Sequence, residues 1–498
     1  MTGKTTDYLA LDLGAESGRG LLGRFDGETL ALEEVHRFPN GSVRMLDSLV
    51  WDAPRLWAEM KVALGKAASA HPGLDGVGVD AWGVDFGLVG RGDTLLGNPV
   101  HYRDPRTEGM MDLAFSKVSR ERIYEATGLQ FLPINTLYQL LALKTANSPL
   151  LEVAETLLMI PDLFGWLLTG RRAGERTDAS TTQLLDPRSG TWSDALCRDL
   201  GLPRSILPNL IEPGTELGPL RKSVAEELGI STPLTVLVPG THDTASAVAA
   251  VPTRGTGTNP PDWCYLSSGT WSLLGAEIPR PVINEATLKG NFTNEGGVGG
   301  TTRLLKNIMG LWLVQECRRT WARLGREYSY DDLIALARAA RPFVTLVEPD
   351  DPSFLAPGDM PARLAAFASR TGQPTPGDEG AFVRCALESL ALKYRWTIRR
   401  IEAILGTRIK VVHVVGGGAR NALLCQFTAD ACGIPVHAGP VEATAAGNVL
   451  LQAMARGRIG SLADARAIVA ASFPVETYEP RDVAAWEDAA GRFEGFAR

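Results

Sequence analysis

Cysteine and histidine are both scarce in this chain, with six of each among 498 residues, and no CxxC pair or HExxH motif occurs. This scarcity argues against disulfide scaffolds and against cysteine- or histidine-based metal centres, and the scattered cysteines favour a reduced, cytoplasmic protein. The chain also lacks any apolar run of about twenty residues, and residues 1–7 are polar. We therefore expect neither a membrane span nor a signal peptide.

An excess of positive charge is absent as well. The 50 lysine and arginine residues are outnumbered by 57 acidic residues, which gives a net charge of −7. This balance leaves no electrostatic footprint for nucleic acid or an anionic membrane, so we expect neither as a partner. A hydrophobic content of 45% with 21% charged residues is typical of a globular protein. The length exceeds what one core supports and predicts two domains, 1–248 and 249–498.

The familiar nucleotide-binding motifs are missing too. Gly3-Lys4-Thr5 resembles the end of a P-loop, but the upstream glycine would precede residue 1, and no other GxxxxGK[ST] occurs. The turn Gly416–Asn421 contains GxG but has asparagine where the dinucleotide fingerprint has its third glycine. Because Glu442 lies near the spacing of a ribose-binding acid, an NAD-linked oxidoreductase stays open as an alternative.

A β-hairpin is predicted over Tyr8–Leu22, where an apolar run ends at Asp12, turns through Gly14–Gly18 and returns through a second apolar run. The small residues and the hydroxyl at its tip let oxygens approach the backbone closely, so the N–H groups there can bind an anion. Asp12 stands at the edge of the tip, where it can hold a magnesium ion directly or through water. From this stretch alone, an ordinary hairpin with a polar turn is an equally good interpretation.

The same plan occurs again at Tyr265–Leu274, where an apolar run, a tip with glycine and hydroxyl residues, and another apolar run follow one another. A glycine-rich turn also follows the buried strand predicted at Val411–Val415. Helical and strand patterns alternate through the C-terminal part, which indicates an α/β fold. Two similar hairpins in separate halves, together with this turn, suggest a nucleotide held between two related domains.

Asp243 is the most informative chemical candidate. It follows the buried strand predicted at Leu234–Pro239 and stands at the start of a helical pattern, near the predicted domain boundary. Phosphoryl transfer to a hydroxyl needs a carboxylate that takes the alcohol proton while backbone amides and magnesium hold the phosphate, and Asp243 can supply it. The structural alternative is that Asp243 caps the helix and His242 fills a turn. The stretch taken alone is compatible with both.

A long helix is predicted over Arg303–Leu324, with Asn307 and Gln315 eight residues apart and therefore roughly on one face. Polar residues amid so many apolar ones suggest a polar line that faces inward, although a solvated stripe explains the spacing equally well. Before this helix, residues 249–262 are rich in glycine and proline and predict an exposed hinge loop.

Eight stretches follow one another along the chain in the order found in a known family: Asp12–Arg19, Asp80–Phe86, Tyr102–Thr107, Gln130–Leu140, Thr241–Ala247, Ser267–Ser272, Lys306–Trp312 and Gly416–Gly418. They resemble the FGGY carbohydrate kinase family of the actin/hexokinase-like ATPase superfamily. The hairpins and the glycine turn are shared across that family. The stretches that begin at Trp82, Gln130 and Lys306 resemble more particularly the members that phosphorylate L-rhamnulose.

This resemblance implies two ribonuclease-H-like domains flanking a central cleft, with sugar binding and the first phosphate hairpin in the N-terminal domain and nucleotide binding in the C-terminal one. The implied reaction is ATP plus L-rhamnulose giving L-rhamnulose 1-phosphate and ADP, with Mg²⁺ as cofactor, in a cytoplasmic monomer or homodimer. Kinases for L-fuculose or D-xylulose are the alternatives within the family. An actin-like ATPase switch that needs no sugar is the alternative from another class.

The resemblance also implies a set of site residues. Asp243 would be the proton acceptor, and Asp12 would lie near magnesium, possibly through water. The implied ATP contacts are Ala15, Glu16, Ser17, Gly18, Arg19, Thr270, Gln315 and Gly417. The implied sugar contacts are Gly83, His242, Asp243, Thr244 and Asn307. Glu16 departs from the family pattern, because some members carry a small hydroxyl residue there, and its carboxylate would repel phosphate unless it points outward or lies near magnesium or Arg19.

Overall fold

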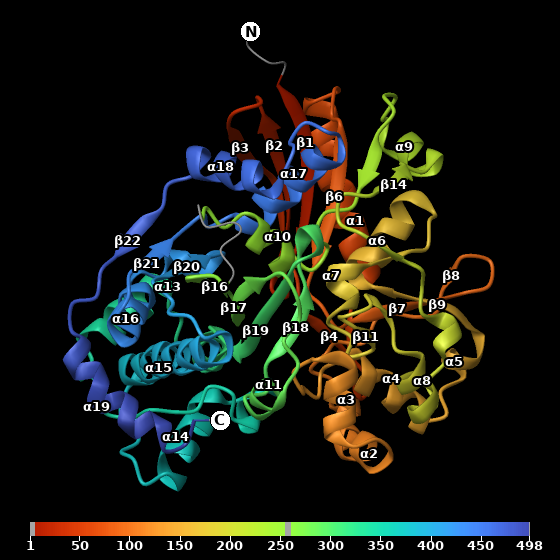
Figure 1. Ribbon diagram of the computed structural model, residues 1–498. Coiled ribbons are helices and arrows are strands. Elements are labelled where there is room, and N and C mark those ends of the chain that lie inside the picture. Colours follow the sequence, from red (N-terminus) through yellow and green to blue (C-terminus); the bar gives the residue numbers. More distant parts are fainter. Residues whose placement is uncertain (1–4, 254–259, 498) are drawn as a thin grey trace. The chain divides into compact units, whose positions relative to one another are not determined.

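The computed structural model describes residues 5–253 and 260–497, and its chain divides into two units (Figure 1). Unit 1 comprises residues 1–256, 277–304 and 442–473. Unit 2 comprises residues 257–276, 305–441 and 474–498. The α/β class and the two-domain organisation expected from the sequence are confirmed. Along the described chain, no helix combines the length and the apolarity needed to cross a membrane.

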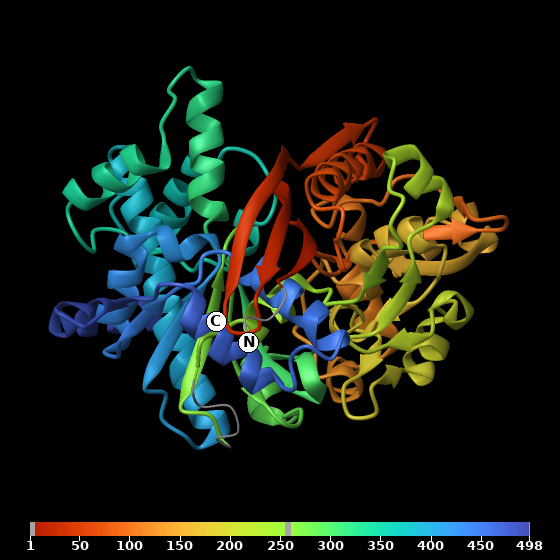
Figure 2. The ribbon, with the colours of Figure 1, turned by 90° about the horizontal axis from the view of Figure 1, so that it is seen from above.

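The main sheet of unit 1 has the strand order β14-β15-β6-β1-β2-β3. The strands of unit 1 are β1 (Thr6–Leu13), β2 (Ser17–Phe25), β3 (Leu30–Pro39), β4 (Ser42–Met45), β5 (Ser48–Trp51), β6 (Gly76–Ala81), β7 (Phe86–Gly90), β8 (Thr94–Leu95), β9 (Ala154–Met159), β10 (Gly174–Glu175), β11 (Leu185–Asp186), β12 (Thr191–Trp192), β13 (Leu210–Ile211), β14 (Glu216–Pro219), β15 (Thr235–Leu237) and β18 (Thr293–Gly296). The predicted hairpin at Tyr8–Leu22 is confirmed, because β1 and β2 pair antiparallel. Figure 2 shows β1, β2 and β3 from above, as the red strands.

Parallel pairing at the centre of this sheet determines where the polar residues lie. Strands β1, β6 and β15 run parallel to one another, so their carboxyl ends meet at one edge. In that register Asp12 of β1 is the direct partner of Asp80 of β6. The next residue of β6, Ala81, forms an isolated parallel bridge with His242, and its N–H donates to the Thr241 carbonyl (2.9 Å). The sheet edge therefore gathers three acidic or imidazole-bearing segments, as open α/β sheets do at their ligand sites.

Of the α-helices in the described residues, thirteen belong to unit 1. They are α1 (Ala53–Ala70), α2 (Met110–Lys117), α3 (Arg120–Thr127), α4 (Thr136–Thr145), α5 (Pro149–Val153), α6 (Ile160–Thr169), α7 (Arg176–Ala179), α8 (Asp194–Leu200), α9 (Lys222–Leu228), α10 (Asp243–Ala249), α11 (Glu285–Lys289), α17 (Ala443–Ala455) and α18 (Leu462–Ser472). Helix α17 comes from far along the sequence but packs on β1, β6 and α10. Gln452 on α17 donates to the Leu9 carbonyl of β1 (2.9 Å), and Asn448 donates to Asp80 (2.5 Å).

Unit 2 is built around strands β16 (Trp263–Ser268), β17 (Trp271–Ile278), β19 (Thr302–Met309), β20 (Val411–Val415), β21 (Val436–Ala438) and β22 (Glu476–Tyr478). Together with β18 they form a sheet in the order β18-β19-β17-β16-β20-β21-β22, in which β17 runs from unit 2 into unit 1 and β19 from unit 1 into unit 2. The helices of unit 2 are α12 (Trp312–Arg323), α13 (Tyr330–Ala339), α14 (Met360–Arg370), α15 (Glu379–Leu405), α16 (Ala422–Cys432) and α19 (Val483–Glu494). The second predicted hairpin is confirmed as β16–β17, which pair antiparallel.

The helix predicted over Arg303–Leu324 is wrong in its first part. Residues 302–309 form strand β19, Gly310 follows, and only then does α12 begin. Every residue of β19 except Asn307 is buried, and a strand buried on both faces shows no alternation of polar and apolar residues that would separate it from a helix. Asn307 and Gln315 therefore do not share a helix face.

The predicted domains 1–248 and 249–498 stay a prediction. By packing, residues 277–304 and 442–473 group with unit 1. Within the predicted hinge 249–262, residues 254–259 lie outside the part of the chain that the structure describes. The predicted domains are two continuous stretches of sequence, whereas each packed unit is made of three separate stretches.

Gly447 on α17 provides a test of this packing. A Cβ there would lie 1.9 Å from the Ser246 carbonyl oxygen of α10, a backbone atom that cannot rotate away. We expect Gly447→Ala to destabilise the protein by roughly 3 kcal/mol or more, since overpacked cores must shift backbone. Gly65→Ala on α1 is the matched control, because its Cβ would meet only Leu228 at 3.6 Å.

The control should be neutral or stabilising by about 0.5–1 kcal/mol, because alanine is the better helix former. Thermal unfolding followed by circular dichroism compares the two variants with the native chain. Equal midpoints for Gly447→Ala and Gly65→Ala would contradict the close approach of α10 and α17.

Candidate active site

Two carboxyl groups lie side by side where β1 and β6 end. Asp12 is 5% exposed, and its register partner Asp80 is fully buried. Burial raises the pKa of Asp80 well above its usual range, and the charges of Asp12 and Asp243 raise it further. The amide of Asn448, which donates to Asp80 Oδ2, opposes that rise. The other oxygen, Oδ1, is buried without a hydrogen-bond donor among the described residues.

Arg19 balances part of this negative charge. Its guanidinium contacts Asp12 (2.5 Å) and also forms an ion pair with Glu442, at the start of α17. Burial alone would lower the pKa of Arg19, but the two carboxylates outweigh it and raise the pKa, so the side chain stays a cation. Arg19 thus faces the sheet edge from the end of the phosphate hairpin.

The hairpin tip that carries Ala15, Glu16, Ser17 and Gly18 is held as a defined turn. Gly14 N–H donates to the Ser17 carbonyl (3.0 Å), and Asn40 binds the carbonyls of Glu16 and Gly14 through its backbone N–H (2.9 Å) and side-chain amide (2.8 Å). A Cβ on Gly18 would lie 2.2 Å from the Phe38 ring, so the close approach requires glycine. From the sequence we expected a small residue here so that an anion could approach the backbone. The structure shows instead that Gly18 makes room for the Phe38 ring of β3.

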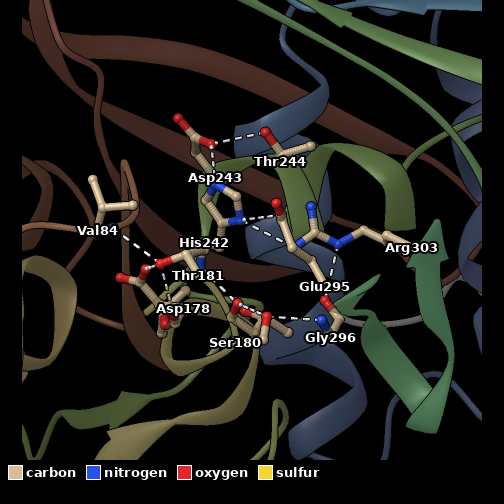
Figure 3. A network of polar contacts seen from close by, with 12 residues as sticks. Val84, Asp178, Ser180, Thr181, His242, Asp243, Thr244, Glu295, Gly296 and Arg303 are labelled. Carbon is tan, nitrogen blue, oxygen red and sulfur yellow. Dashed lines mark hydrogen bonds and ion pairs between the residues drawn. The ribbon is translucent and has the colours of Figure 1, made fainter. Parts of the chain in front are cut away.

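Asp243 is the first residue of α10, and His242 is its N-cap. The alternative in which Asp243 caps the helix is therefore wrong. Thr244 Oγ1 donates to Asp243 Oδ1 (3.0 Å), and His242 Nε2 lies 3.6 Å from the same oxygen (Figure 3). The side chain keeps 32% of its surface exposed, yet the surrounding protein excludes enough water that burial raises its pKa, and nearby Asp12 raises it further.

The loop that presents His242 and Asp243 is clamped from below by Glu175. This fully buried carboxylate accepts hydrogen bonds from the Thr241 N–H (3.0 Å) and hydroxyl (2.6 Å), and from the N–H of Thr177 (2.7 Å). The Thr177 hydroxyl in turn accepts from the His242 N–H (3.2 Å). A loop fixed by this many bonds presents its side chains with little freedom.

A second network holds the imidazole of His242 from behind. Arg303 Nη2 lies 3.0 Å from His242 Nδ1, and Glu295 on β18 contacts both groups (Figure 3). Arg303 is fully buried and Glu295 is 3% exposed. Sequence reasoning missed Asp80, Glu175, Glu295 and Arg303. Only Asp80 carried a signal, as an acid inside the apolar strand Val77–Ala81.

Gly83 lies in a strained turn after β6. A Cβ there would lie 2.8 Å from Thr181, and the next residue, Val84, has φ of 68°. A β-branched residue rarely takes this left-handed conformation, so the surroundings must enforce it. The Thr181 hydroxyl accepts from the Val84 N–H (3.0 Å), while Thr136 Oγ1 donates to the Val84 carbonyl (2.7 Å). The predicted sugar contact Gly83 therefore sits on a rigid loop.

Asp85 completes this loop beneath a cluster of aromatic rings. Its carboxylate accepts from the indoles of Trp51 (2.6 Å) and Trp82 (3.1 Å), from Tyr102 N–H (3.1 Å) and from the Gln139 amide (2.9 Å). Burial raises the pKa of Asp85 to about 6, although these donors oppose the rise. Asp85 thereby ties four separate segments of unit 1 together.

In unit 2, backbone hydrogen bonds join the segment that carries Thr270 to the segment that carries Gln315. The Thr270 carbonyl, at the tip of the β16–β17 hairpin, accepts from the N–H groups of Gly310 and Trp312 (3.2 Å each), at the start of α12. Gln315 lies in the first turn of that helix, and its Oε1 is buried without a hydrogen-bond donor in the described chain. Such an orphaned acceptor is a candidate ligand contact.

The glycine-rich turn packs against the same hairpin tip. A Cβ on Gly418 would lie 2.0 Å from Ser268 Oγ, and one on Gly416, which has φ of 81°, would lie 3.2 Å from the Ser268 carbonyl. Gly417 between them meets nothing within 4 Å and is open to a ligand. The end of the β16–β17 hairpin therefore contacts both the start of α12, which carries Gln315, and the turn that carries Gly417, whereas Asn307 lies on β19.

The scan against family models matches residues 7–250 to the N-terminal domain and residues 264–456 to the C-terminal domain of the FGGY family of carbohydrate kinases. Among curated proteins, the chain is 42% identical over 492 residues to a rhamnulokinase of Bacteroides thetaiotaomicron, covering 99% of each chain. It is 40% identical over 470 residues to a rhamnulokinase of Oceanobacillus iheyensis, covering 94% of this chain and 97% of the relative.

Solved structures share the fold at lower identity. A gluconate kinase from Lactobacillus acidophilus superposes with a TM-score of 0.79 at 17% identity, covering 99% of this chain and 97% of that one. A glycerol kinase from Plasmodium falciparum, solved with ADP, superposes with a TM-score of 0.75 at 15% identity, covering 99% and 98%. These likenesses establish the fold of both halves.

The raised pKa of Asp85 predicts how stability depends on pH. The pKa of Asp85 is about 6 in the folded chain and 3.8 in the unfolded chain, so the folded state binds the proton more tightly. The resulting gain in unfolding free energy is fully present below pH 3.8 and is lost as pH rises through about 6. Asp85→Asn removes this titration, so its stability relative to the native chain should improve by about 2 kcal/mol between pH 4 and pH 7.

Unfolding midpoints of the variant and native chain across this pH range measure that difference, with Asp47→Asn in an exposed turn as the control. Asp85→Asn also loses hydrogen bonds, which lowers its midpoint at every pH. The test is therefore how the midpoint difference between variant and native chain changes with pH. A midpoint difference that stays flat with pH would contradict a buried, titrating Asp85.

Proposed function

Because the chain belongs to the FGGY family of carbohydrate kinases, we propose that it transfers the γ-phosphoryl group of ATP to O1 of L-rhamnulose, giving L-rhamnulose 1-phosphate and ADP. The observation that carries this proposal is the position of the Asp243 carboxylate. It lies at the start of α10, beside His242, at the carboxyl edge of a parallel sheet. The identity to curated rhamnulokinases over nearly the whole chain supports the choice of sugar.

In this proposal Asp243 is the general base. Its carboxylate takes the proton of the O1 hydroxyl as that oxygen attacks phosphorus, which a positioned base must do for an alcohol nucleophile. The raised pKa of Asp243 brings its titration closer to neutral pH, where a base is most effective. The Thr244 hydroxyl, which donates to Asp243, keeps the carboxylate oriented. We expect kcat/KM to fall as pH decreases through this raised pKa, because the protonated carboxyl group can no longer take the alcohol proton.

The sugar and the nucleotide are assigned to separate residues. Gly83, His242, Thr244 and Asn307 contact the ketose, and the rigid turn at Val84 supports the first of them. The ATP phosphates contact the tip from Ala15 to Arg19, where Arg19 supplies positive charge, and Thr270, Gln315 and Gly417 of unit 2. We propose 1–248 as the functional part for sugar binding and 249–498 as the part for nucleotide binding, in a cytoplasmic enzyme.

Magnesium is the metal we propose. Among the described residues, no three aspartate, glutamate, histidine or cysteine side chains are arranged to hold a metal by themselves. Asp12 and Asp80 lie side by side instead, and the orphaned Asp80 Oδ1 leaves an oxygen available. This donor set suits Mg²⁺, which is usually held by one or two carboxylates together with water and substrate phosphates. When bound, the ion would neutralise phosphate charge.

Asp243→Asn tests the proposed base. The variant keeps the shape of the side chain but cannot take the proton, so kcat should fall by roughly 10²–10⁴-fold. ATP affinity, measured by isothermal titration calorimetry, should not change. Asp112→Asn, exposed on α2, is the control and should retain native turnover. Near-native kcat in Asp243→Asn would remove Asp243 from the proposed role.

The choice of sugar is tested by ADP release with L-rhamnulose, L-fuculose, D-xylulose and L-ribulose at equal concentrations. We expect the highest kcat/KM for L-rhamnulose. A higher value for L-fuculose or D-xylulose would reassign the substrate within the family. Slow ADP release that no sugar stimulates would instead favour an ATPase switch.

A pair of substitutions separates the two binding functions. Gln315→Leu removes the orphaned amide oxygen and should raise KM for ATP by roughly 3- to 10-fold, the cost of one hydrogen bond. Asn307→Ala should raise KM for the ketose instead. Initial-rate kinetics with each substrate varied in turn measure both values. The assignment is wrong if Gln315→Leu changes KM for the ketose and leaves KM for ATP at its native value.

A further inference from the structure

Arg303, Glu295 and His242 form a compact triangle inside unit 1 (Figure 3). Arg303 Nη2 lies 3.0 Å from His242 Nδ1 and 3.2 Å from Glu295 Oε2, and the third side, from Glu295 Oε2 to His242 Nδ1, is 3.4 Å. Arg303 Nε donates to the Gly296 carbonyl (2.9 Å), which fixes the plane of the guanidinium. All three side chains are nearly or fully buried.

The hydrogen bond between Arg303 and His242 has one possible donor. Nη2 of arginine carries two hydrogens and accepts none. Nη2 therefore donates the hydrogen in its 3.0 Å contact with His242 Nδ1, so Nδ1 must present its lone pair. An imidazole that accepts at Nδ1 carries its proton on Nε2. The other nitrogen of His242, Nε2, is the one that lies 3.6 Å from Asp243 Oδ1.

A histidine beside an aspartate can itself be the base, with the aspartate only orienting it, as in hydrolase triads. That role requires an unprotonated nitrogen facing the substrate. In this site the Nδ1 lone pair of His242 accepts the hydrogen bond from Arg303, and Nδ1 is the ring nitrogen that does not face Asp243. His242 therefore has a hydrogen to donate towards Asp243 or a substrate oxygen beside it, and no pair with which to accept.

We propose that Arg303 is a positioning residue that holds His242 as the neutral Nε2–H tautomer, which leaves Asp243 as the one proton acceptor of the pair. The proposal rests on the proposed function only for the identity of the alcohol that loses its proton. Its content, the location of one hydrogen on His242, is a property of the protein without substrate.

The charges around His242 explain why an arginine is needed. Asp243 on α10 and Glu295 on β18 both face the imidazole with carboxylates, and buried Asp178 on α7 lies near enough to Asp243 to interact with its charge. Arg303 on β19 opposes them with a fixed positive charge at 3.0 Å and with a hydrogen pointed at Nδ1. A second hydrogen on Nδ1 would face that donor directly.

The direct test is ¹⁵N NMR of the full-length protein labelled at histidine. With six histidines the spectrum is small, and His242→Gln identifies the signals of His242. Two-bond ¹H–¹⁵N correlations distinguish a protonated from an unprotonated ring nitrogen. We expect His242 to show hydrogen on Nε2 and a bare Nδ1 at the pH of the kinase assay. A proton on Nδ1, in either the other tautomer or the imidazolium, would overturn the proposal whatever the sugar proves to be.

Variants test whether Arg303 causes this state. Arg303→Met combined with Glu295→Gln removes the donor without leaving an unpaired buried carboxylate, and it should lose the Nε2–H signature and lower kcat/KM for the sugar by roughly 10- to 100-fold. Glu295→Gln alone keeps the Arg303 donor and should keep the signature. Arg303→Lys, which can still donate, should recover part of the loss. A double variant that retains the native tautomer would overturn the role of Arg303.

Discussion

Repulsion among Asp12, Asp80 and Asp243 is the interaction that the surrounding residues of unit 1 have to balance. Parallel pairing of β1 with β6 makes Asp12 and Asp80 direct neighbours, and burial raises the pKa of Asp80 and of Asp243. Arg19 supplies a cation and Asn448 a hydrogen bond that oppose this repulsion. A cluster that is costly when empty is well prepared for a divalent cation and phosphate, because binding relieves the repulsion that folding imposes.

The same region is mechanically stiff for reasons that are separate from charge. Glu175 fixes the segment before His242, Thr181 and Thr136 hold the strained turn at Val84, and Asp85 joins four segments beneath the aromatic rings. Each of these contacts connects segments distant in the sequence. Phosphoryl transfer depends on positioning more than on covalent chemistry. Buried polar groups that hold the site residues in place are therefore expected in a kinase.

Local patterns made the hairpins and the start of α10 predictable from the sequence, because each depends on neighbouring residues. Strand β19 was not predictable, since a strand buried on both faces has no alternation to separate it from a helix. The partners of the candidate base were also beyond reach. Arg303 meets His242 across 61 positions, Glu175 meets Thr241 across 66, and Asn448 meets Asp80 across 368. Such pairs are set by topology, which no short window contains.

The return of residues 442–473 to unit 1 affects how the chain is made. The ribosome releases the β1–β2 hairpin first, but Gln452, which binds the Leu9 carbonyl, follows 443 residues later. At the usual translation speed this gap lasts roughly 20–90 s. Throughout that time the nascent face of β1 and β6 waits without α17. Unit 1 therefore cannot finish folding before unit 2 has been almost entirely synthesised, and the growing chain depends on protection from aggregation while it waits.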